Sequence, residues 1–327
     1  MQRLIAVIIA AVFFLPHAAL CAKPAPATSG PYPTKPIRFI ISFGPGSASD
    51  ALARIAGQEL TQSLGQPVVV LPKPGADGAL SGLEVKRATP DGYTFLFGSN
   101  SALAVVVSLR KEPPYDPTKD FTPITYLGDN TFFIVVHPSI PAKSIAELVA
   151  HAKANPKTIN YPVGNTYAIA ATAIFAANNG ILMHPVPYKS EPDAIPDLLA
   201  GRVQLLFSTF TSAGPHVKEG KLRALATTLD ERSSLMPDVP TLQEAGQKKL
   251  PIGPWFGLVG PPGLPRELVT RMNKEMVAVL AKPNVKELML RHGFMAKSST
   301  PEVLGAYIKD QVAVWKTVLK AAGVDPQ

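Results

Sequence analysis

Short apolar runs alternate with amphipathic stretches along most of the chain, and this alternation is the feature that most constrains the fold. The apolar runs, rich in β-branched and aromatic residues, predict buried strands at 37–42, 67–72, 94–99, 132–137, 203–208, 222–228 and 255–260. The amphipathic stretches predict helices at 50–63, 144–154, 167–179, 191–200, 265–281 and 301–322. Strands that alternate with helices indicate an α/β fold, and we expect its sheets to be mainly parallel.

Two helix starts carry their own capping signals. Ser144 with Glu147 three residues later forms a capping box, and Thr300 before Pro301 places an N-cap ahead of a first-turn proline. The chain is long enough for two domains, although no Gly/Ser linker separates them.

The N-terminus has the pattern of a signal peptide over residues 1–22. Arg3 precedes an apolar run from Leu4 to Leu15, which is shorter than the roughly 20 residues that span a bilayer. We expect cleavage after Ala22. The alternative is a lipoprotein anchor at Cys21, against which stands the bulky Leu20 where a lipobox has a small residue. Cys21 is the only cysteine, so the mature chain must be stabilised by its core rather than by a disulfide.

The formal net charge of +8 does not point to nucleic acid. Lys and Arg are scattered singly and are not interleaved with aromatic residues, so a basic surface that mildly favours anionic ligands is the better interpretation. No segment after the leader is long and apolar enough to be transmembrane.

Sequence signatures of catalysis are absent. The chain has no G-x-S-x-G elbow, no phosphate-binding P-loop, no H-E-x-x-H and no C-x-x-C, and the histidines of the mature chain do not pair at ligand spacing. We therefore expect no metal and no cofactor. A secreted α/β hydrolase is the alternative from another class, and the lack of a nucleophile–base pair argues against it.

The loop Gly44-Pro45-Gly46-Ser47-Ala48-Ser49 joins a predicted strand to a predicted helix. Small residues leave the first amides of such a helix unobstructed, which makes an anion site; the alternative is that Ser47 or Ser49 only caps the helix and Asp50 offsets its dipole. Gly164-Asn165-Thr166 leads into a second helix in the same way, and a third polar loop at 98–102 follows a strand. These loops suggest a ligand cleft.

Phrases distributed over the mature chain closely resemble the Bug/TctC family, the periplasmic solute-binding proteins of tripartite tricarboxylate transporters. They include "YPTKPIRFIISFGPGSASD", "PDGYTFLFGS", "INYPVGN", "LLAGRVQLLFS", "DVPTLQEAG" and "WFGLVGPPGLP". The resemblance implies a two-lobed, type II periplasmic-binding fold, with 32–130 and 255–327 in lobe 1 and 131–254 in lobe 2. It also implies a periplasmic, monomeric receptor that passes a small carboxylate to permease subunits.

By position, the resemblance assigns ligand contacts to both lobes. In lobe 1 they are Phe43, Gly46, Ser47, Ala48, Ser49, Asp50, Ser99 and Ser101; in lobe 2 they are Gly164, Asn165, Thr166, Tyr167, Tyr188, Ser208 and Thr209.

Departures from the family pattern bear on the ligand. This chain has Ser208 where the family usually has Asp, and Ser190-Glu191 where it has Gly-Gly. The absence of an Asp at position 208 removes a negative charge from the cleft, which favours a ligand with a second carboxylate. Phe43, Leu103, Tyr167 and Phe210 are candidates for an aromatic lining or for ordinary core. We expect an aromatic dicarboxylate such as terephthalate, ahead of an aliphatic one such as adipate. An orphan receptor that contacts a sensor kinase is the alternative function.

The leader gives a direct prediction. Mass spectrometry of the exported protein should find an N-terminus near Lys23 and no lipid, whereas a diacylated Cys21 would contradict the signal-peptide assignment.

Overall fold

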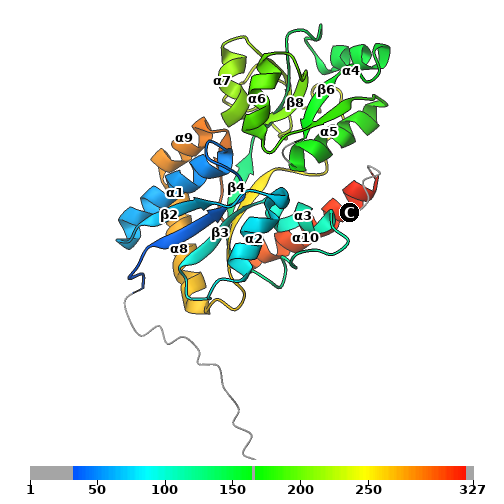
Figure 1. The fold of residues 1–327 in the computed structure, drawn as a ribbon. Helices are drawn as coiled ribbons and strands as arrows, with labels where there is room; N and C mark the ends of the chain where they lie inside the picture. The colour runs from blue at the N-terminus through cyan, green and yellow to red at the C-terminus, as the bar shows by residue number, and fades with distance from the viewer. Residues whose placement is uncertain (1–31, 164–165, 322–327) are drawn as a thin grey trace, which may run out of the picture. The chain divides into compact units, whose positions relative to one another are not determined.

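A six-stranded sheet is built from the two ends of the described chain (Figure 1). The computed structural model describes residues 32–163 and 166–321, so the predicted signal peptide at 1–22 lies outside the described residues. The strand order is β11-β4-β10-β3-β1-β2. The bounds are β1 (Ile37–Ile41), β2 (Val68–Pro72), β3 (Thr94–Ser99), β4 (Thr122–Asn130), β10 (Trp255–Gly260) and β11 (Phe294–Ala296). Because β10 pairs with both β3 and β4, the sheet joins segments that are far apart in sequence.

Helices cover this sheet on both faces. α1 packs against α8 and α9, while α10 packs against β4 and against a short helical segment that follows β3. The long helices are α1 (Ala48–Leu64), α2 (Ala79–Lys86), α8 (Arg266–Ala281), α9 (Pro283–Arg291) and α10 (Pro301–Ala321); the short ones are η1 (Ala76–Gly78), the π-helix η2 (Ser101–Val105) and α3 (Val106–Ser108).

The middle of the chain forms two smaller sheets, ordered β8-β5-β9 and β6-β7. The strands are β5 (Phe132–Val136), β6 (Asn160–Val163), β7 (His184–Pro187), β8 (Leu205–Thr209) and β9 (Arg223–Thr227), and the helices are α4 (Ile145–Ala154), α5 (Thr166–Asn179), α6 (Glu191–Leu199) and α7 (Phe210–Lys218). Within the described ranges these five strands form their ladders only with one another.

The burial of both faces of strand β5 explains why its sequence is apolar without interruption. Alternate side chains of a strand point to opposite faces. Phe132 and Ile134 lie in a core shared with α5, whereas Phe133 and Val135 lie in a second core with α6 and α7. The strand is therefore buried on both sides, as a central strand between two helix layers must be.

The predicted strands and helices are confirmed with shifts of a few residues at their ends, and the α/β class is confirmed. The expectation of mainly parallel sheets is wrong for the described strands. The pairs β1–β2, β1–β3 and β6–β7 are parallel, whereas the other five pairings are antiparallel. The long connection into β10 returns the chain in the opposite direction, which periodicity within a strand does not encode. The segment 98–102 is also not a loop, because η2 begins at Ser101.

Both predicted N-caps are confirmed, but the capping box is only half formed, because the Glu147 carboxylate accepts from the Lys143 amide and not from that of Ser144. The Ser144 hydroxyl accepts a hydrogen bond from the Glu147 amide at 3.2 Å, and the Thr300 hydroxyl accepts one from Val303 at 3.3 Å. Where the chain leaves the six-stranded sheet, the Asn130 amide donates to the Pro254 carbonyl at 2.8 Å, so these two segments run side by side. The division into lobes at 131 and 254 stays a prediction. In the described ranges, every helix is too short or too polar to cross a membrane.

Gly128 provides a test of the register between β4 and β11. Its φ of +136° disfavours any residue with a side chain, and an added Cβ would collide with the backbone carbonyl of Met295. Gly128→Ala should lower the free energy of unfolding by about 2 kcal/mol or more. The control Gly263→Ala, at φ +74° with open space around the added Cβ, should cost about 1 kcal/mol. Equal urea midpoints for the two variants would contradict the close approach of β11.

Candidate functional site

A pocket lies where the six-stranded sheet and the middle of the chain meet. Its walls come from the β1–α1 loop, the end of β3, the link between β4 and β5, and the starts of α5, α6 and α7. Most of these segments begin a helix or end a strand, where backbone groups are left without partners from their own element.

The β1–α1 loop is held in shape by its own polar groups. The Ser47 hydroxyl accepts from the Asp50 amide at 3.3 Å and shares a hydrogen bond of 3.0 Å with the Ser49 hydroxyl. Asp50 Oδ2 accepts from the Gly46 amide at 3.2 Å, and Oδ1 pairs with Arg54 at 2.9 Å. Gly46 has a φ of +79°, which glycine adopts without strain. Asp50 therefore closes the loop instead of facing a ligand.

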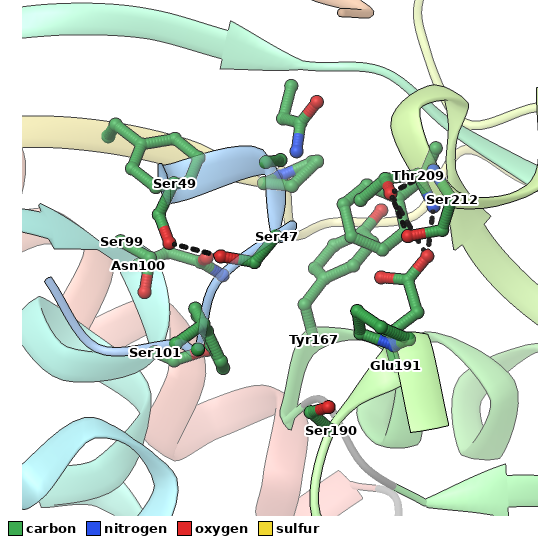
Figure 2. A pocket seen from close by; sticks show the side chains of 18 of the residues that line it. Ser47, Ser49, Ser99, Asn100, Ser101, Tyr167, Ser190, Glu191, Thr209 and Ser212 are labelled. Atoms are coloured by element: carbon green, nitrogen blue, oxygen red, sulfur yellow. Dashed lines mark hydrogen bonds between the residues drawn. The ribbon is translucent and has the colours of Figure 1, made fainter. Parts of the chain in front are cut away.

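Free donors gather at the first turn of α1. Ala48 and Ser49 are the first two residues of the helix, so their amides have no acceptor within it. The buried Ser99 hydroxyl and the Asn100 side-chain amide nitrogen have no hydrogen-bond partner among the described residues. We call Ser47, Ser49, Ser99, Asn100 and Ser101 the serine cluster; Figure 2 shows them together on one side of the pocket.

The other side of the pocket is organised around Glu191, whose residue surface is 7% exposed. One of its oxygens, Oε1, accepts from the Ser208 hydroxyl at 2.7 Å, the Thr209 amide at 2.7 Å and the Thr209 hydroxyl at 3.0 Å. Thr209 also caps α7 through the Ser212 amide at 3.3 Å. We call Glu191, Ser208, Thr209 and Ser212 the Glu191 cluster. Figure 2 shows three of its members across the pocket from the serine cluster.

The electrostatics of the Glu191 cluster are set by burial. Removal from water raises the pKa of the Glu191 carboxyl, and the hydrogen bonds from Ser208 and Thr209 only partly oppose that rise. The described residues that line the pocket include no Lys, Arg or His. Within the described ranges there is also no cluster of His, Cys, Asp and Glu suited to a metal ion.

Aromatic rings form the apolar part of the wall, at Phe43, Phe132, Tyr167 and Phe256. Tyr167 packs edge-on against Phe132, with ring centroids 4.7 Å apart. Burial raises the pKa of the Tyr167 hydroxyl, so it remains a neutral group. The proposed aromatic lining is thus found for Phe43 and Tyr167.

Two other candidates for the lining belong to the core. Leu103 is fully buried in the larger hydrophobic core, which includes residues of the six-stranded sheet. Phe210 lies in the second core and packs against Phe133, with ring centroids 6.3 Å apart.

Eight of the predicted site residues line the pocket: Phe43, Ser47, Ala48, Ser49, Ser99, Ser101, Tyr167 and Thr209. Gly46, Asp50, Tyr188 and Ser208 do not line it. The Tyr188 hydroxyl instead donates to Asp197 at 2.6 Å, and Ser208 is fully buried behind Glu191. Gly164 and Asn165 lie outside the described residues, as does the side chain of Thr166.

Sequence reasoning missed several lining residues, which are Gly44, Pro45, Asn100, Asn130, Phe132, Ser190, Glu191, Pro192, Ser212, Pro254 and Phe256. Glu191 matters most among them. Its position after Ser190 at a helix start has the pattern of a first-turn acidic residue, which is normally solvent-exposed. The only feature of the sequence that pointed to Glu191 is the presence of Ser190-Glu191 where the family pattern has Gly-Gly.

The pocket does not lack a negative group, contrary to the expectation from Ser208. Ser208 does stand at the position discussed, but its hydroxyl holds the Glu191 carboxyl at the pocket wall. A carboxyl group is therefore present, and it comes from a different element.

The chain is similar to proteins of known family and known structure. The model of the tripartite tricarboxylate transporter family receptor (TctC) matches residues 52–324. Protein BugT of Bordetella pertussis strain Tohama I is 32% identical, over 99% of this chain and 98% of its own. The structure of R. palustris Rpa4515 with adipate has a TM-score of 0.86 at 28% identity, covering 90% of this chain and all of that one. MatC of Rhodopseudomonas palustris with bound malate has a TM-score of 0.81 at 26% identity, covering 88% and 100%.

The raised pKa of Glu191 has a measurable consequence for stability. The native state holds the Glu191 proton to higher pH than the unfolded chain does, so the wild type should lose stability as the pH rises from the unfolded pKa toward the native one. Glu191→Gln removes this loss, so its urea midpoint should rise relative to that of the wild type as the pH increases.

Glu302→Gln provides a control of opposite sign. A hydrogen bond from its own backbone amide, with one from Thr300, lowers the pKa of Glu302, so this variant should fall behind the wild type as the pH rises. A midpoint difference for Glu191→Gln that is constant with pH would show that Glu191 titrates normally.

Proposed function

The chain belongs to the tripartite tricarboxylate transporter receptor family, and from this premise we propose that it binds a small dicarboxylate in the pocket between the serine cluster and the Glu191 cluster. Members of this family are extracytoplasmic solute receptors and not enzymes. The observation that carries the proposal is the group of unpartnered donors at the first turn of α1 and at the end of β3, in a pocket whose described lining has no cation.

One ligand carboxylate would bind at the serine cluster. The amides of Ala48 and Ser49 and the side chains of Ser99 and Asn100 are the donors available there. A hydrogen bond to a charged group contributes about 1.5–3 kcal/mol, and a helix N-terminus about 0.3–2 kcal/mol. Because micromolar affinity corresponds to about 8 kcal/mol, several such contacts suffice without an Arg salt bridge.

The remainder of the pocket favours a ligand with a flat, apolar middle. Phe43, Phe132, Tyr167 and Phe256 provide aromatic surface along the wall. This composition favours an aromatic dicarboxylate such as terephthalate. An aliphatic dicarboxylate is the second candidate, because the structurally similar Rpa4515 was solved with adipate and MatC with malate.

We place this receptor in the periplasm, as a monomer that delivers its ligand to the permease subunits of a tripartite tricarboxylate transporter. The family assignment supports this role, together with the signal-peptide pattern at 1–22. Contact with a sensor kinase is the alternative, and identification of the membrane protein that captures the liganded receptor separates the two.

Asn100→Ala tests the carboxylate site. The Asn100 side chain is buried with its NH₂ group unpartnered, so its removal should leave the unliganded protein as stable as before or more stable. Terephthalate affinity should fall about 10- to 150-fold, the equivalent of one hydrogen bond of about 1.5–3 kcal/mol to a charged group. Calorimetry gives the affinity, and urea unfolding gives the stability.

The matched control is Asn284→Ala, which removes an asparagine that contacts Glu59 at 3.3 Å at an exposed position. It should leave terephthalate binding unchanged. An Asn100→Ala protein that binds terephthalate as tightly as the wild type would show that the carboxylate does not bind at the serine cluster.

A further inference from the structure

We propose that Glu191 makes dicarboxylate binding proton-coupled: in the complex, Glu191 is a neutral acid that donates its O–H to the second carboxylate of the ligand. This inference rests on the proposed function, since it specifies how the far end of a dicarboxylate is held. It assigns Glu191 as a specificity-determining residue.

The hydrogen bonds of the Glu191 carboxyl fix where its proton must be. Three donor groups, the Thr209 amide and the hydroxyls of Ser208 and Thr209, lie within hydrogen-bond distance of Oε1, which has two acceptor positions, so this oxygen is saturated as an acceptor. A proton on the carboxyl therefore sits on the other oxygen, Oε2. In Figure 2, Oε2 points away from Thr209 and Ser212, into the pocket that Glu191 lines. Neutral Glu191 thus presents a single donor to whatever occupies this end of the pocket.

No charged side chain near Glu191 lies at the pocket wall, where it could act as the counter-ion of an ionised Glu191. Neither β5 nor β8 carries a charged residue. The titratable groups around Glu191 are Lys189 in the segment before α6, Asp193 and Asp197 on α6, His184 on β7, His216 and Lys218 on α7, Tyr161 on β6, Tyr167 on α5, and Asp50, Arg54 and Glu59 on α1. Of these, only Tyr167 lines the pocket, and it is neutral.

Charge on the ligand then decides the protonation of Glu191. A dicarboxylate held at the serine cluster by one end directs its other carboxylate toward the Glu191 cluster. Two ionised carboxylates in hydrogen-bond contact repel strongly, so one of them takes up a proton. As the ligand binds, a proton from solvent is placed on Oε2 and is shared with the ligand oxygen, and no other bond forms or breaks.

The chemical alternative is a ligand that ends in an ammonium group, for which an ionised Glu191 would be the natural partner. The buried position of Glu191 disfavours that ionised state, since burial raises the pKa of this carboxyl. A pair of probe compounds distinguishes the two cases, because terephthalate and 4-(aminomethyl)benzoate share a benzoate end and differ at the other.

The experiment is calorimetry of the full mature protein with sodium terephthalate from pH 5 to pH 9, in buffers of different ionisation enthalpy. Above the pKa of Glu191 in the free receptor, affinity should fall about tenfold per pH unit, with uptake approaching one proton per ligand. The half-amide 4-carbamoylbenzoate should bind without this pH dependence, because its far end carries no charge.

Variants link the effect to Glu191. Glu191→Gln, whose NH₂ replaces the acid O–H as a donor, should bind terephthalate at least as tightly as the wild type and with no pH dependence. Glu302→Gln, which changes an exposed glutamate at the first turn of α10, should keep the wild-type pH dependence.

Three results would overturn the inference while leaving the receptor function in place. They are pH-independent binding of terephthalate by the wild type, a loss of tenfold or more in Glu191→Gln, and tighter binding of 4-(aminomethyl)benzoate than of terephthalate at pH 7. If none of the three probes nor adipate binds at any pH, the proposed function fails, and the inference fails with it.

Discussion

An anion bound in a pocket without a cationic side chain must be held by neutral donors, and this constraint organises the site described here. The first turn of α1 provides amides that the helix cannot use, and the end of β3 adds a hydroxyl and a side-chain amide without partners among the described residues. Such donors lie in a buried wall, where salt screens them far less than it screens surface charges. The basic surface of the chain therefore attracts anions, but it does not provide the contacts that select one.

The same constraint applies at the opposite wall, where the chain places an acid of its own. Glu191 is held by Ser208 and Thr209, at the point where β8 ends and α7 begins. A buried carboxyl fixed in this way discriminates between the ligand groups that can bind beside it. It accepts a second ligand carboxylate only together with a proton, and it would accept a donor group without one.

Much of the fold could be predicted from the sequence because several strands are largely apolar and buried along their whole length and several helices begin at capping residues. The strand at 132–136 was recognisable since both faces of it are apolar, and Ser144 and Thr300 marked helix starts that the structure confirms. Strand β4 was missed because its polar residues and Pro123 hide the strand pattern. Helix α7 was missed because Gly214 and Pro215 break its helical pattern. The antiparallel pairings of this chain join strands that are far apart in sequence, and local patterns do not encode such pairings.

The candidate site was predictable where a local pattern carried it and not where tertiary packing did. Ser47 and Ser49 were identified because small residues between a strand and a helix have a direct chemical meaning. Glu191 was not identified, because only the packing of α6 onto β8 turns a first-turn glutamate inward. Tyr188 was expected at the site but does not line it, since its hydroxyl donates to Asp197 of α6.

The most direct test of this binding site is a crystal structure of the protein with 2-bromoterephthalate, with the ligand located by anomalous scattering from bromine. We expect bromine density inside the pocket, with one carboxylate within hydrogen-bond distance of the Ala48 and Ser49 amides and the other against Glu191 Oε2. Density outside this pocket, or a carboxylate paired with a Lys or Arg side chain, would contradict it.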